Sequence, residues 1–167
     1  MGTELRKLSL EDGENVYWMM QQLPADENGF SNPIFGRTYE EYKSWLVSNV
    51  RSSQMTQVVD GWKVPQTTYW LYENNQPVGI GRIRHFLTEK LLEEGGNISY
   101  AIEPSARGRG LGKLLLSMLL TECREMGMGK ALITTNKDNL VSQKVIHANG
   151  GQMEKENEKY RYFWVHL

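Results

Sequence analysis

The stretch that most constrains this chain is a run of glycines and basic residues placed directly before a strong apolar helix pattern. Residues 102–113 read IEPSARGRGLGK, and residues 114–126 continue as LLLSMLLTECREM. From Leu111 onward the apolar residues recur about every 3.6 residues, which predicts a helix running to Met126 and Gly127. The alternating segment before the run predicts a strand. A strand, a glycine turn and a helix in this order commonly bind anions.

Two common glycine motifs do not fit this turn. A P-loop has the form G-x-x-x-x-G-K-[ST], but Arg107 stands at its first glycine position and Leu114 follows the lysine. A dinucleotide-binding fingerprint needs a third glycine where Lys113 stands. The physics of an anion site remains, because the first N–H groups of a helix have no intrahelical acceptor and glycines let a phosphate approach them. Arg107, Arg109 and Lys113 add charge-assisted contacts.

The other periodicities predict a mixed α/β order around one sheet, with strands and helices interleaved along the chain. Strands are expected at 3–10, 67–73, 77–86, 97–103, 130–136 and 159–167. Helices are expected at 11–23, 38–53, 111–127 and 138–149. Thr38 and Glu41 fit a capping box at the start of the second helix, and Trp18 in the first is expected to pack in the core. The polar turn after residue 73 indicates a hairpin, residues 24–36 read as a loop, and residues 86–96 form a charged connector with room for one helical turn. The length of 167 residues fits one domain, residues 1–167.

Composition excludes several classes of protein. The formal net charge is −1, so the chain has no basic excess to attract nucleic acid or an anionic membrane. Cys123 is the only cysteine, which rules out an internal disulfide. No apolar run is long enough to span a membrane, and the N-terminal residues lack a signal-peptide core. Three scattered histidines give no metal-ligand spacing, so no metal is expected. We therefore expect a cytoplasmic protein.

Two motifs carry a resemblance to a known family. The run AIEPSARGRGLGKLLL resembles the acetyl-coenzyme A motif of the GNAT superfamily of N-acetyltransferases, Gln/Arg-x-x-Gly-x-Gly/Ala, which Arg107, Gly110 and Gly112 match position for position. The run NKDNLVSQKVIHANGG resembles the following motif of that family, an Asn and then a helix that ends at a glycine. The resemblance implies a mostly antiparallel, twisted sheet of about six to seven strands with helices on both faces. It also implies that the strands at 97–103 and 130–136 splay apart and that acetyl-coenzyme A binds between them.

The resemblance also implies which residues bind that cosubstrate. Backbone amides from Arg107 to Gly112 would hold the pyrophosphate, and main-chain groups near Ile102 would pair with the pantetheine arm like another strand. Asn139 would hydrogen-bond the same arm. The expected cosubstrate-binding residues are Ile102, Arg107, Gly108, Arg109, Gly110, Leu111, Gly112, Lys113 and Asn139.

The implied reaction is transfer of an acetyl group from acetyl-coenzyme A to a primary amine by direct attack in a ternary complex. Many members place a tyrosine in the helix of the second motif as the acid that protonates the leaving thiolate. Ile146 stands at that position here and cannot donate a proton. Tyr100 is the candidate donor in its place, with water as the alternative.

The general base is open at the level of sequence. His85 follows a predicted strand and has a suitable intrinsic pKa for proton transfer near neutrality. Glu103 at the end of the strand before the glycine turn is another candidate. Glu89, Glu93 and Glu94 in the charged connector read as a solvated surface or as further candidates.

Two other functions compete with the acetyltransferase. Ile146 favours a catalytically silent acyl-coenzyme A binding or sensor module. Nucleic-acid binding by the basic turn is disfavoured by the overall charge. The amine acceptor is left open between small molecules, such as polyamines, aminoglycosides or amino acids, and peptide amines. Trp62 either packs or lines an acceptor pocket with Phe30 and Phe35. The oligomeric state is left open, and an exposed terminal strand at 160–167 is a candidate for pairing across a homodimer.

Overall fold

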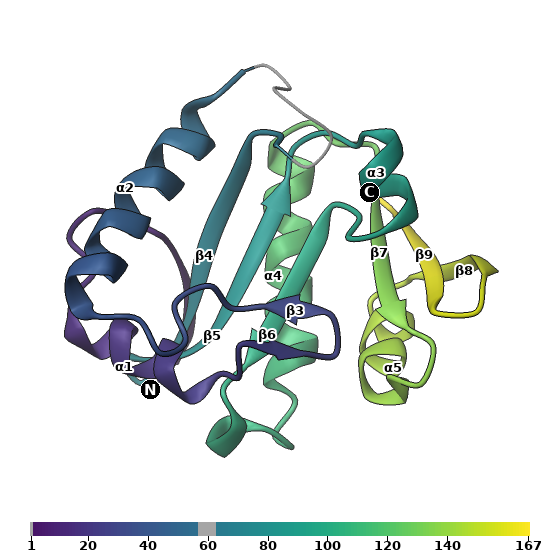
Figure 1. The fold of residues 1–167 in the computed structure, drawn as a ribbon. Coiled ribbons are helices and arrows are strands. Elements are labelled where there is room, and N and C mark those ends of the chain that lie inside the picture. The colour runs from purple at the N-terminus through teal and green to yellow at the C-terminus, as the bar shows by residue number, and fades with distance from the viewer. Residues whose placement is uncertain (1, 57–62) are drawn as a thin grey trace.

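The computed structural model describes residues 2–56 and 63–167, and its strands form a four-stranded sheet, a three-stranded sheet and a two-stranded hairpin (Figure 1). The strands are β1 (Thr3–Lys7), β2 (Asp26–Glu27), β3 (Phe30–Ser31), β4 (Gln66–Glu73), β5 (Gln76–Arg84), β6 (Ile98–Ile102), β7 (Lys130–Asn136), β8 (Gln152–Glu156) and β9 (Tyr160–His166). The helices are α1 (Glu14–Gln22), α2 (Tyr39–Gln54), α3 (Glu89–Glu93), α4 (Leu111–Glu125) and α5 (Leu140–Ala148), with a 3₁₀ turn at Pro104–Ala106.

The four-stranded sheet has the order β1-β4-β5-β6, and every neighbouring pair is antiparallel. The predicted hairpin of β4 and β5 is confirmed. Its turn consists of Asn74 and Asn75, whose φ angles of 50° and 65° lie in the left-handed region. Asn tolerates this region better than most residues, and two such residues match the twist of the flanking strands.

The three-stranded sheet has the order β7-β9-β8 and is also antiparallel. Within the described residues the two larger sheets are joined by one isolated bridge, Gly96 to Ile133. Beyond that bridge β6 and β7 diverge, as Figure 1 shows. The expected splayed strands are therefore confirmed, and they divide the strands into two sheets where a single ladder was expected.

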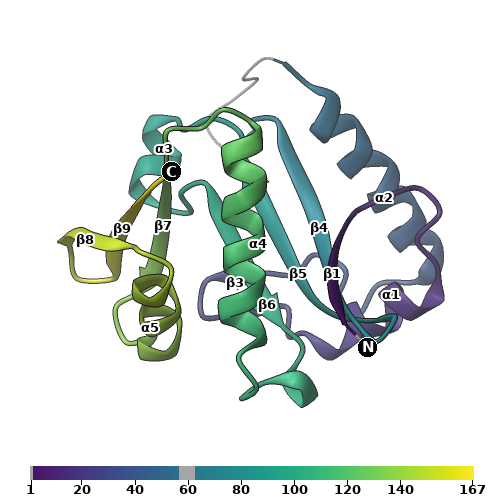
Figure 2. The same ribbon diagram turned by 180° about the vertical axis from the view of Figure 1, so that it is seen from behind.

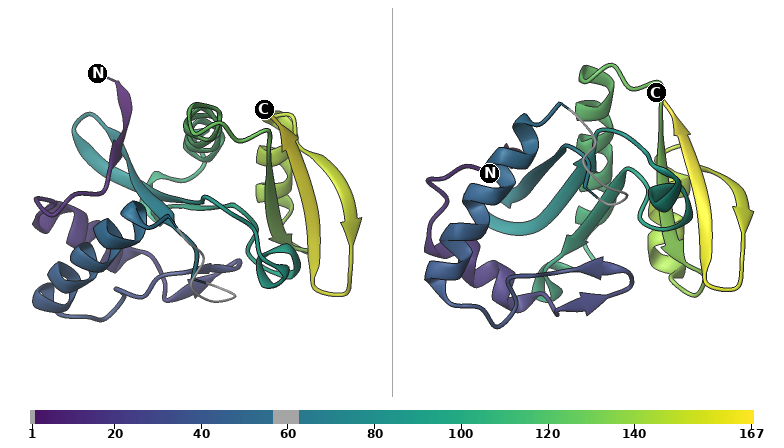
Figure 3. Two further views of the ribbon diagram at one scale, coloured as in Figure 1. Left: turned by 90° about the horizontal axis from the view of Figure 1, so that it is seen from above. Right: turned by 45° about the horizontal axis from the view of Figure 1, so that its top comes forward.

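Helices cover both faces of the four-stranded sheet (Figures 2 and 3). Helix α4 lies on one face, and α1 and α2 lie on the other. Gly81 on β5 lets α4 approach closely, since a Cβ at that position would lie 2.6 Å from Leu119 Cδ1. On the opposite face Trp70 of β4 is fully buried beneath the two N-terminal helices. The capping box predicted for α2 is present between Thr38 and Glu41.

Three features differ from the sequence prediction. Strand β8 was missed because all of its residues are exposed, so it lacks the alternation of apolar and polar residues that marks a half-buried strand. The β2–β3 hairpin lies in the expected loop, and its strands are too short to leave a pattern. Trp18, predicted to pack in the core, has 58% of its surface exposed.

The expectation that the C-terminal strand is an exposed edge, free to pair across a dimer, is also wrong. β9 lies between β7 and β8, so both of its edges are already paired. The outer strands of this sheet are β7, which borders the opening toward β6, and β8. The sequence of β8, QMEKE, carries the charged residues that discourage edge pairing. In the part of the chain that the structure describes, no helix has the length and apolar character needed to cross a bilayer.

Candidate functional site

A cavity of about 620 Å³ lies where β6 and β7 diverge. Its walls come from β5, β6, β7, the first turn of α4 and the first turns of α5, and the β2–β3 hairpin closes one side. In Figure 1 this hairpin crosses in front of β5 and β6, on the face opposite α4. The cavity therefore extends from the glycine turn to the region beneath the hairpin.

The glycine turn exposes the start of α4. Gly108 and Gly110 have φ angles of 82° and 80°, and Gly110 is the N-cap without a side chain to cap the helix. A Cβ at either glycine would have no atom within 4 Å. Leu114 N–H donates to Gly110 O at 3.1 Å, so the preceding N–H groups of this first turn have no intrahelical acceptor. These N–H groups and the helix dipole favour an anion here.

The side chains around the turn are only partly available to a ligand. Arg107 donates through Nε to Ile102 O at 2.8 Å, and its guanidinium pairs with Glu27 of the hairpin. Arg109 forms a two-pronged pair with Glu73, with distances of 3.0 and 2.7 Å. These hydrogen bonds hold the pKa of both carboxyl groups below the ordinary value.

Lys113 also borders the cavity. Unlike the two arginines, it has no ion pair among the described residues. Of the three cations expected at the turn, it is the one that is not already neutralised by a carboxylate.

Strand β6 pairs with β5 along one edge, and its other edge faces the cavity. Glu103 N–H donates to Val78 O and Arg84 N–H donates to Asn97 O, which sets the alternation of the β5–β6 ladder. The main-chain groups of Tyr100 and Ile102 then point to the other edge. These groups border the opening between the two sheets, although Arg107 already uses Ile102 O.

Tyr100 and Ser142 meet across the cavity, with their hydroxyl oxygens 2.8 Å apart. Burial raises the pKa of Tyr100 to about 12, and the hydrogen bond to Ser142 partly offsets the increase. Asn139 is the N-cap of α5, and its side-chain oxygen accepts from Ser142 N–H at 3.3 Å. Ile146 is fully buried in the core and lies against Gly151, where a Cβ would come 2.3 Å from its Cγ2.

Two of the predicted catalytic residues lie elsewhere. His85 shares a 2.8 Å hydrogen bond with Thr67 on β4, and burial lowers its pKa. Glu103 accepts from Ser105 in the 3₁₀ turn. Neither belongs to the described residues that line the cavity. Trp62, the other acceptor-pocket candidate, lies outside the described residues, whereas Phe30 lines the cavity and Phe35 is 48% exposed.

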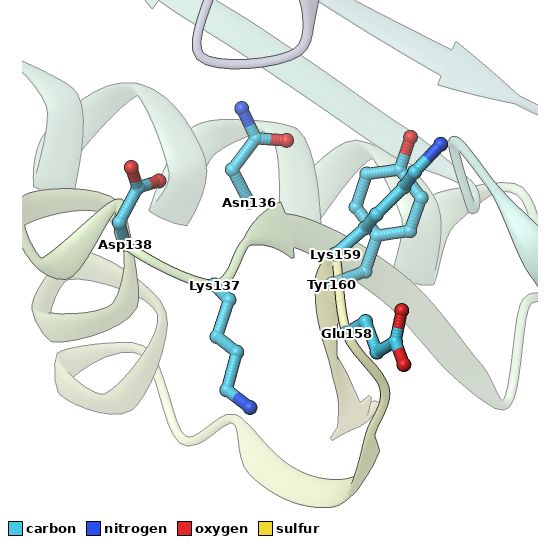
Figure 4. A pocket seen from close by; sticks show the side chains of 6 residues that line it. All are labelled: Asn136, Lys137, Asp138, Glu158, Lys159 and Tyr160. Carbon is cyan, nitrogen blue, oxygen red and sulfur yellow. The ribbon is translucent and has the colours of Figure 1, made fainter.

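Glu94 at the end of the connector lines the cavity and accepts a hydrogen bond of 3.0 Å from the Tyr160 hydroxyl. A shallower depression of about 500 Å³ adjoins this place, where β7 ends beside the start of β9 (Figure 4). In Figure 4 Asn136 and Tyr160 point to the same side of the strands and Lys137 points away from them. Asn136 and Tyr160 line both spaces, so the depression is the outer end of the cavity region.

Sequence reasoning missed Arg82 and Arg84, which also line the cavity. The available signal was two arginines separated by one residue within an otherwise apolar strand, because such residues share one face of a sheet. Among the described residues no three His, Cys, Asp or Glu side chains cluster in a way that would hold a metal ion.

Comparison with known proteins identifies the architecture around this cavity. A model of the acetyltransferase (GNAT) family matches residues 35–150. The chain belongs to this family. It is therefore an acyltransferase, and members of the family use acetyl-coenzyme A as cosubstrate. The sequence matches no curated protein.

Solved structures of GNAT acetyltransferases share the fold at low sequence identity. RimL, a ribosomal L7/L12 α-N-protein acetyltransferase in complex with coenzyme A, is 15% identical with a TM-score of 0.76, over 100% of this chain and 95% of its own. The microcin C7 self-immunity acetyltransferase MccE, with acetyl-coenzyme A and AMP, is 13% identical with a TM-score of 0.73, over 99% and 93%. Campylobacter jejuni PseH with acetyl-coenzyme A is 11% identical with a TM-score of 0.65, over 99% of each chain.

Proposed function

We propose that this chain is a single N-acetyltransferase domain, residues 1–167, that moves an acetyl group from acetyl-coenzyme A to a primary amine by direct attack in a ternary complex. One observation carries the proposal. A single cavity joins the uncapped start of α4 to the open edge of β6 and to a polar region beneath the hairpin. Such a cavity has room for a long thioester at one end and an amine at the other.

The described residues fit acetyl-coenzyme A. Positive φ angles at Gly108 and Gly110, with open space where a Cβ would stand, leave the N–H groups of the turn accessible to a pyrophosphate. In our proposal the amides from Arg107 to Gly112 bind it, with Lys113 as a further cation. The open edge at Ile102 pairs with the pantetheine arm, and the side-chain NH₂ group of Asn139 donates to it.

The reaction needs no covalent enzyme intermediate. The amine nitrogen forms a bond to the thioester carbonyl carbon, the carbon–sulfur bond breaks, the nitrogen loses a proton and the thiolate gains one. Holding both substrates in one cavity can lower the barrier by about 7–11 kcal/mol through proximity alone. An N–H group aimed at the developing oxyanion adds about 3 kcal/mol. The main chain at Ile102 is our candidate for that donor.

For the acid we propose Tyr100, whose hydroxyl lies in the cavity beside Ser142. A pKa of about 12 keeps this hydroxyl protonated near neutral pH, as a proton donor must be. For the base we propose Glu94, a carboxylate that lines the cavity, while His85 stays the alternative from the sequence. Glu103 lies outside the lining residues and is the weaker candidate.

The proposal is tested by incubating the protein with acetyl-coenzyme A and a panel of amines while free thiol is measured. We expect acceptor-dependent thiol release and an N-acetylated product by mass spectrometry. Tight cofactor binding with no thiol release from any amine or peptide would support the silent acyl-coenzyme A binding module instead.

A further inference from the structure

Arg82 and Arg84 place two guanidinium groups in the cavity on the face of the sheet that α4 does not cover. They are two residues apart on β5 and so share a face. Gly81, directly before Arg82, lies on the opposite face, toward Leu119 of α4. Only 8% of the Arg82 surface is exposed. Both arginines line the cavity beneath the hairpin.

Neither arginine has an acidic partner among the described residues. Arg82 Nη1 donates to Ser31 O at 3.0 Å, and the guanidinium carbon of Arg82 lies 4.6 Å from the centre of the Phe30 ring. Arg84 Nη1 donates to Gly95 O and Gly96 O at 3.4 and 3.3 Å. A buried cation without a counter-ion is costly, and the pKa of Arg82 is lowered to about 10 by burial and by Arg84.

Three residues that line the cavity have a buried hydroxyl without a partner among the described residues: Ser99, Thr134 and Thr135. Alternation along β7 places Thr135 on the face opposite Thr134. Ser99 lies directly opposite Arg82 in the β5–β6 register, and its Oγ is buried with no hydrogen bond among the described residues. The same holds for Thr134 Oγ1 on β7, across the opening. Thr134 shares a face with Asn136, whose Oδ1 would lie 3.4 Å from a Cβ placed on Gly29 between β2 and β3. Buried hydroxyls nearly always have a partner, so the hydroxyls of Ser99 and Thr134 point to a ligand that provides one.

We propose that these four residues, which we call the arginine pocket (Arg82, Arg84, Ser99 and Thr134), bind the carboxylate of the amine acceptor. A guanidinium fork and two hydroxyl donors match the two oxygens of a carboxylate. Glu94 lines the same cavity and provides a carboxylate for the acceptor's amino end. The acceptor class is therefore an amine that also carries a carboxylate, such as a free amino acid. This inference rests on the function proposed above.

The test compares three acceptors for each of several amino acids: the free acid, its amide, and the amine that lacks the carboxyl group. We expect kcat/KM for the free acid to exceed that for the other two by about 30-fold or more, the effect of a charge-assisted pair in a desolvated site. Arg82→Met should remove this preference, and Arg82→Lys should retain part of it. Arg37→Met is the matched control, because this arginine side chain is 60% exposed and is not among the described residues that line the cavity.

A purely structural role for Arg82, as the anchor of the hairpin at Ser31, predicts a different result. Arg82→Met would then lower kcat/KM equally for all three acceptors and leave their ratio unchanged, which overturns the inference. The unfolding temperature and acetyl-coenzyme A affinity of each variant show whether it is folded and able to bind its cosubstrate.

A binding measurement separates failure of this inference from failure of the proposed function. Calorimetry of N-acetylamino acids with coenzyme A present measures ligand binding to the arginine pocket in the absence of turnover. Binding that Arg82→Met abolishes supports the pocket even if no amine is acetylated. Acetylation with the same kcat/KM for acceptors with and without the carboxylate supports the proposed function and overturns the inference of the arginine pocket.

Discussion

The two ends of the cavity are built from different parts of the chain. At the α4 end the proposed binding groups are backbone N–H groups, and the nearby arginines are already paired with carboxylates at the surface. Beneath the hairpin the proposed binding groups are side chains, and neither the buried Arg82 nor the half-buried Arg84 has a carboxylate partner among the described residues. In our proposal the α4 end recognises an anion through backbone geometry, whereas the hairpin end recognises one through side-chain charge.

The largest effect is expected from a substitution that disrupts the backbone-built site at the α4 end. Gly110→Glu puts a carboxylate and a Cβ where the diphosphate is proposed to bind, and the φ angle of 80° adds local strain. We expect the Kd for acetyl-coenzyme A to rise by at least about 100-fold, because like charges a few ångström apart repel strongly. Isothermal titration calorimetry measures this.

The matched control lies at the other end of the same helix. Gly127 has a φ angle of 83° and equally open space for a Cβ, so Gly127→Glu introduces the same charge and strain away from the cavity. Its Kd should stay close to that of the wild type. Equal losses in the two variants would mean that strain, and not the lost anion site, accounts for the effect.

The next effect belongs to the side-chain-built end. Glu94→Gln removes the proposed base while keeping the shape of the side chain, and we expect kcat to fall by about 100-fold, a usual contribution of general base catalysis. His85→Gln should change kcat by less than about threefold, since His85 is bonded to Thr67 and is not among the described residues that line the cavity. The reverse pattern in steady-state kinetics would restore His85 as the base.

A smaller effect is expected at Tyr100, which lies between the two ends. Tyr100→Phe should lower kcat by about 10-fold while leaving acetyl-coenzyme A affinity unchanged, because a proton donor is lost and the packing is kept. The raised pKa of about 12 means that the hydroxyl stays protonated below that pH and is lost as a donor only above it. A pH–rate profile of the wild type should therefore show no fall assignable to this group near neutrality. An unchanged kcat in Tyr100→Phe would assign the proton to water.

The smallest expected effect concerns the ion pair that joins the two ends. Glu27→Gln releases Arg107 from the hairpin, and both side chains are partly exposed, so the stability change should be within about 1 kcal/mol. The freed guanidinium becomes available to a phosphate, and we expect acetyl-coenzyme A to bind about two- to threefold more tightly. Weaker binding in calorimetry would show that the pair positions the turn.

The contrast between the two ends also explains what sequence could reveal. A backbone-built anion site requires glycines at fixed spacing before a helix, so the spacing of Arg107, Gly110 and Gly112 predicts it from the sequence. Helix α4 follows from the same stretch of sequence, whereas the splayed strands were expected only from the resemblance to the family. The side-chain-built pocket is only partly visible in the sequence. The spacing of Arg82 and Arg84 indicates a shared face, but Ser99 is brought to Arg82 only by the β5–β6 register.

The remaining misses have similar physical causes. Strand β8 has no buried face, so nothing in QMEKE distinguishes it from a loop. Trp18 lies on the outer side of α1, where its ring packs edge-on against Tyr17, with ring centres 5.1 Å apart. The position of Glu94 in the cavity depends on where β6 separates from β7, a tertiary feature that no local periodicity contains.

A crystal structure of the protein grown with acetyl-coenzyme A tests the central claim most directly. The account predicts diphosphate oxygens within hydrogen-bonding distance of the amides from Arg107 to Gly112, and the thioester between β6 and β7 close to Tyr100. A cosubstrate bound elsewhere, with no contact to the start of α4, would contradict it.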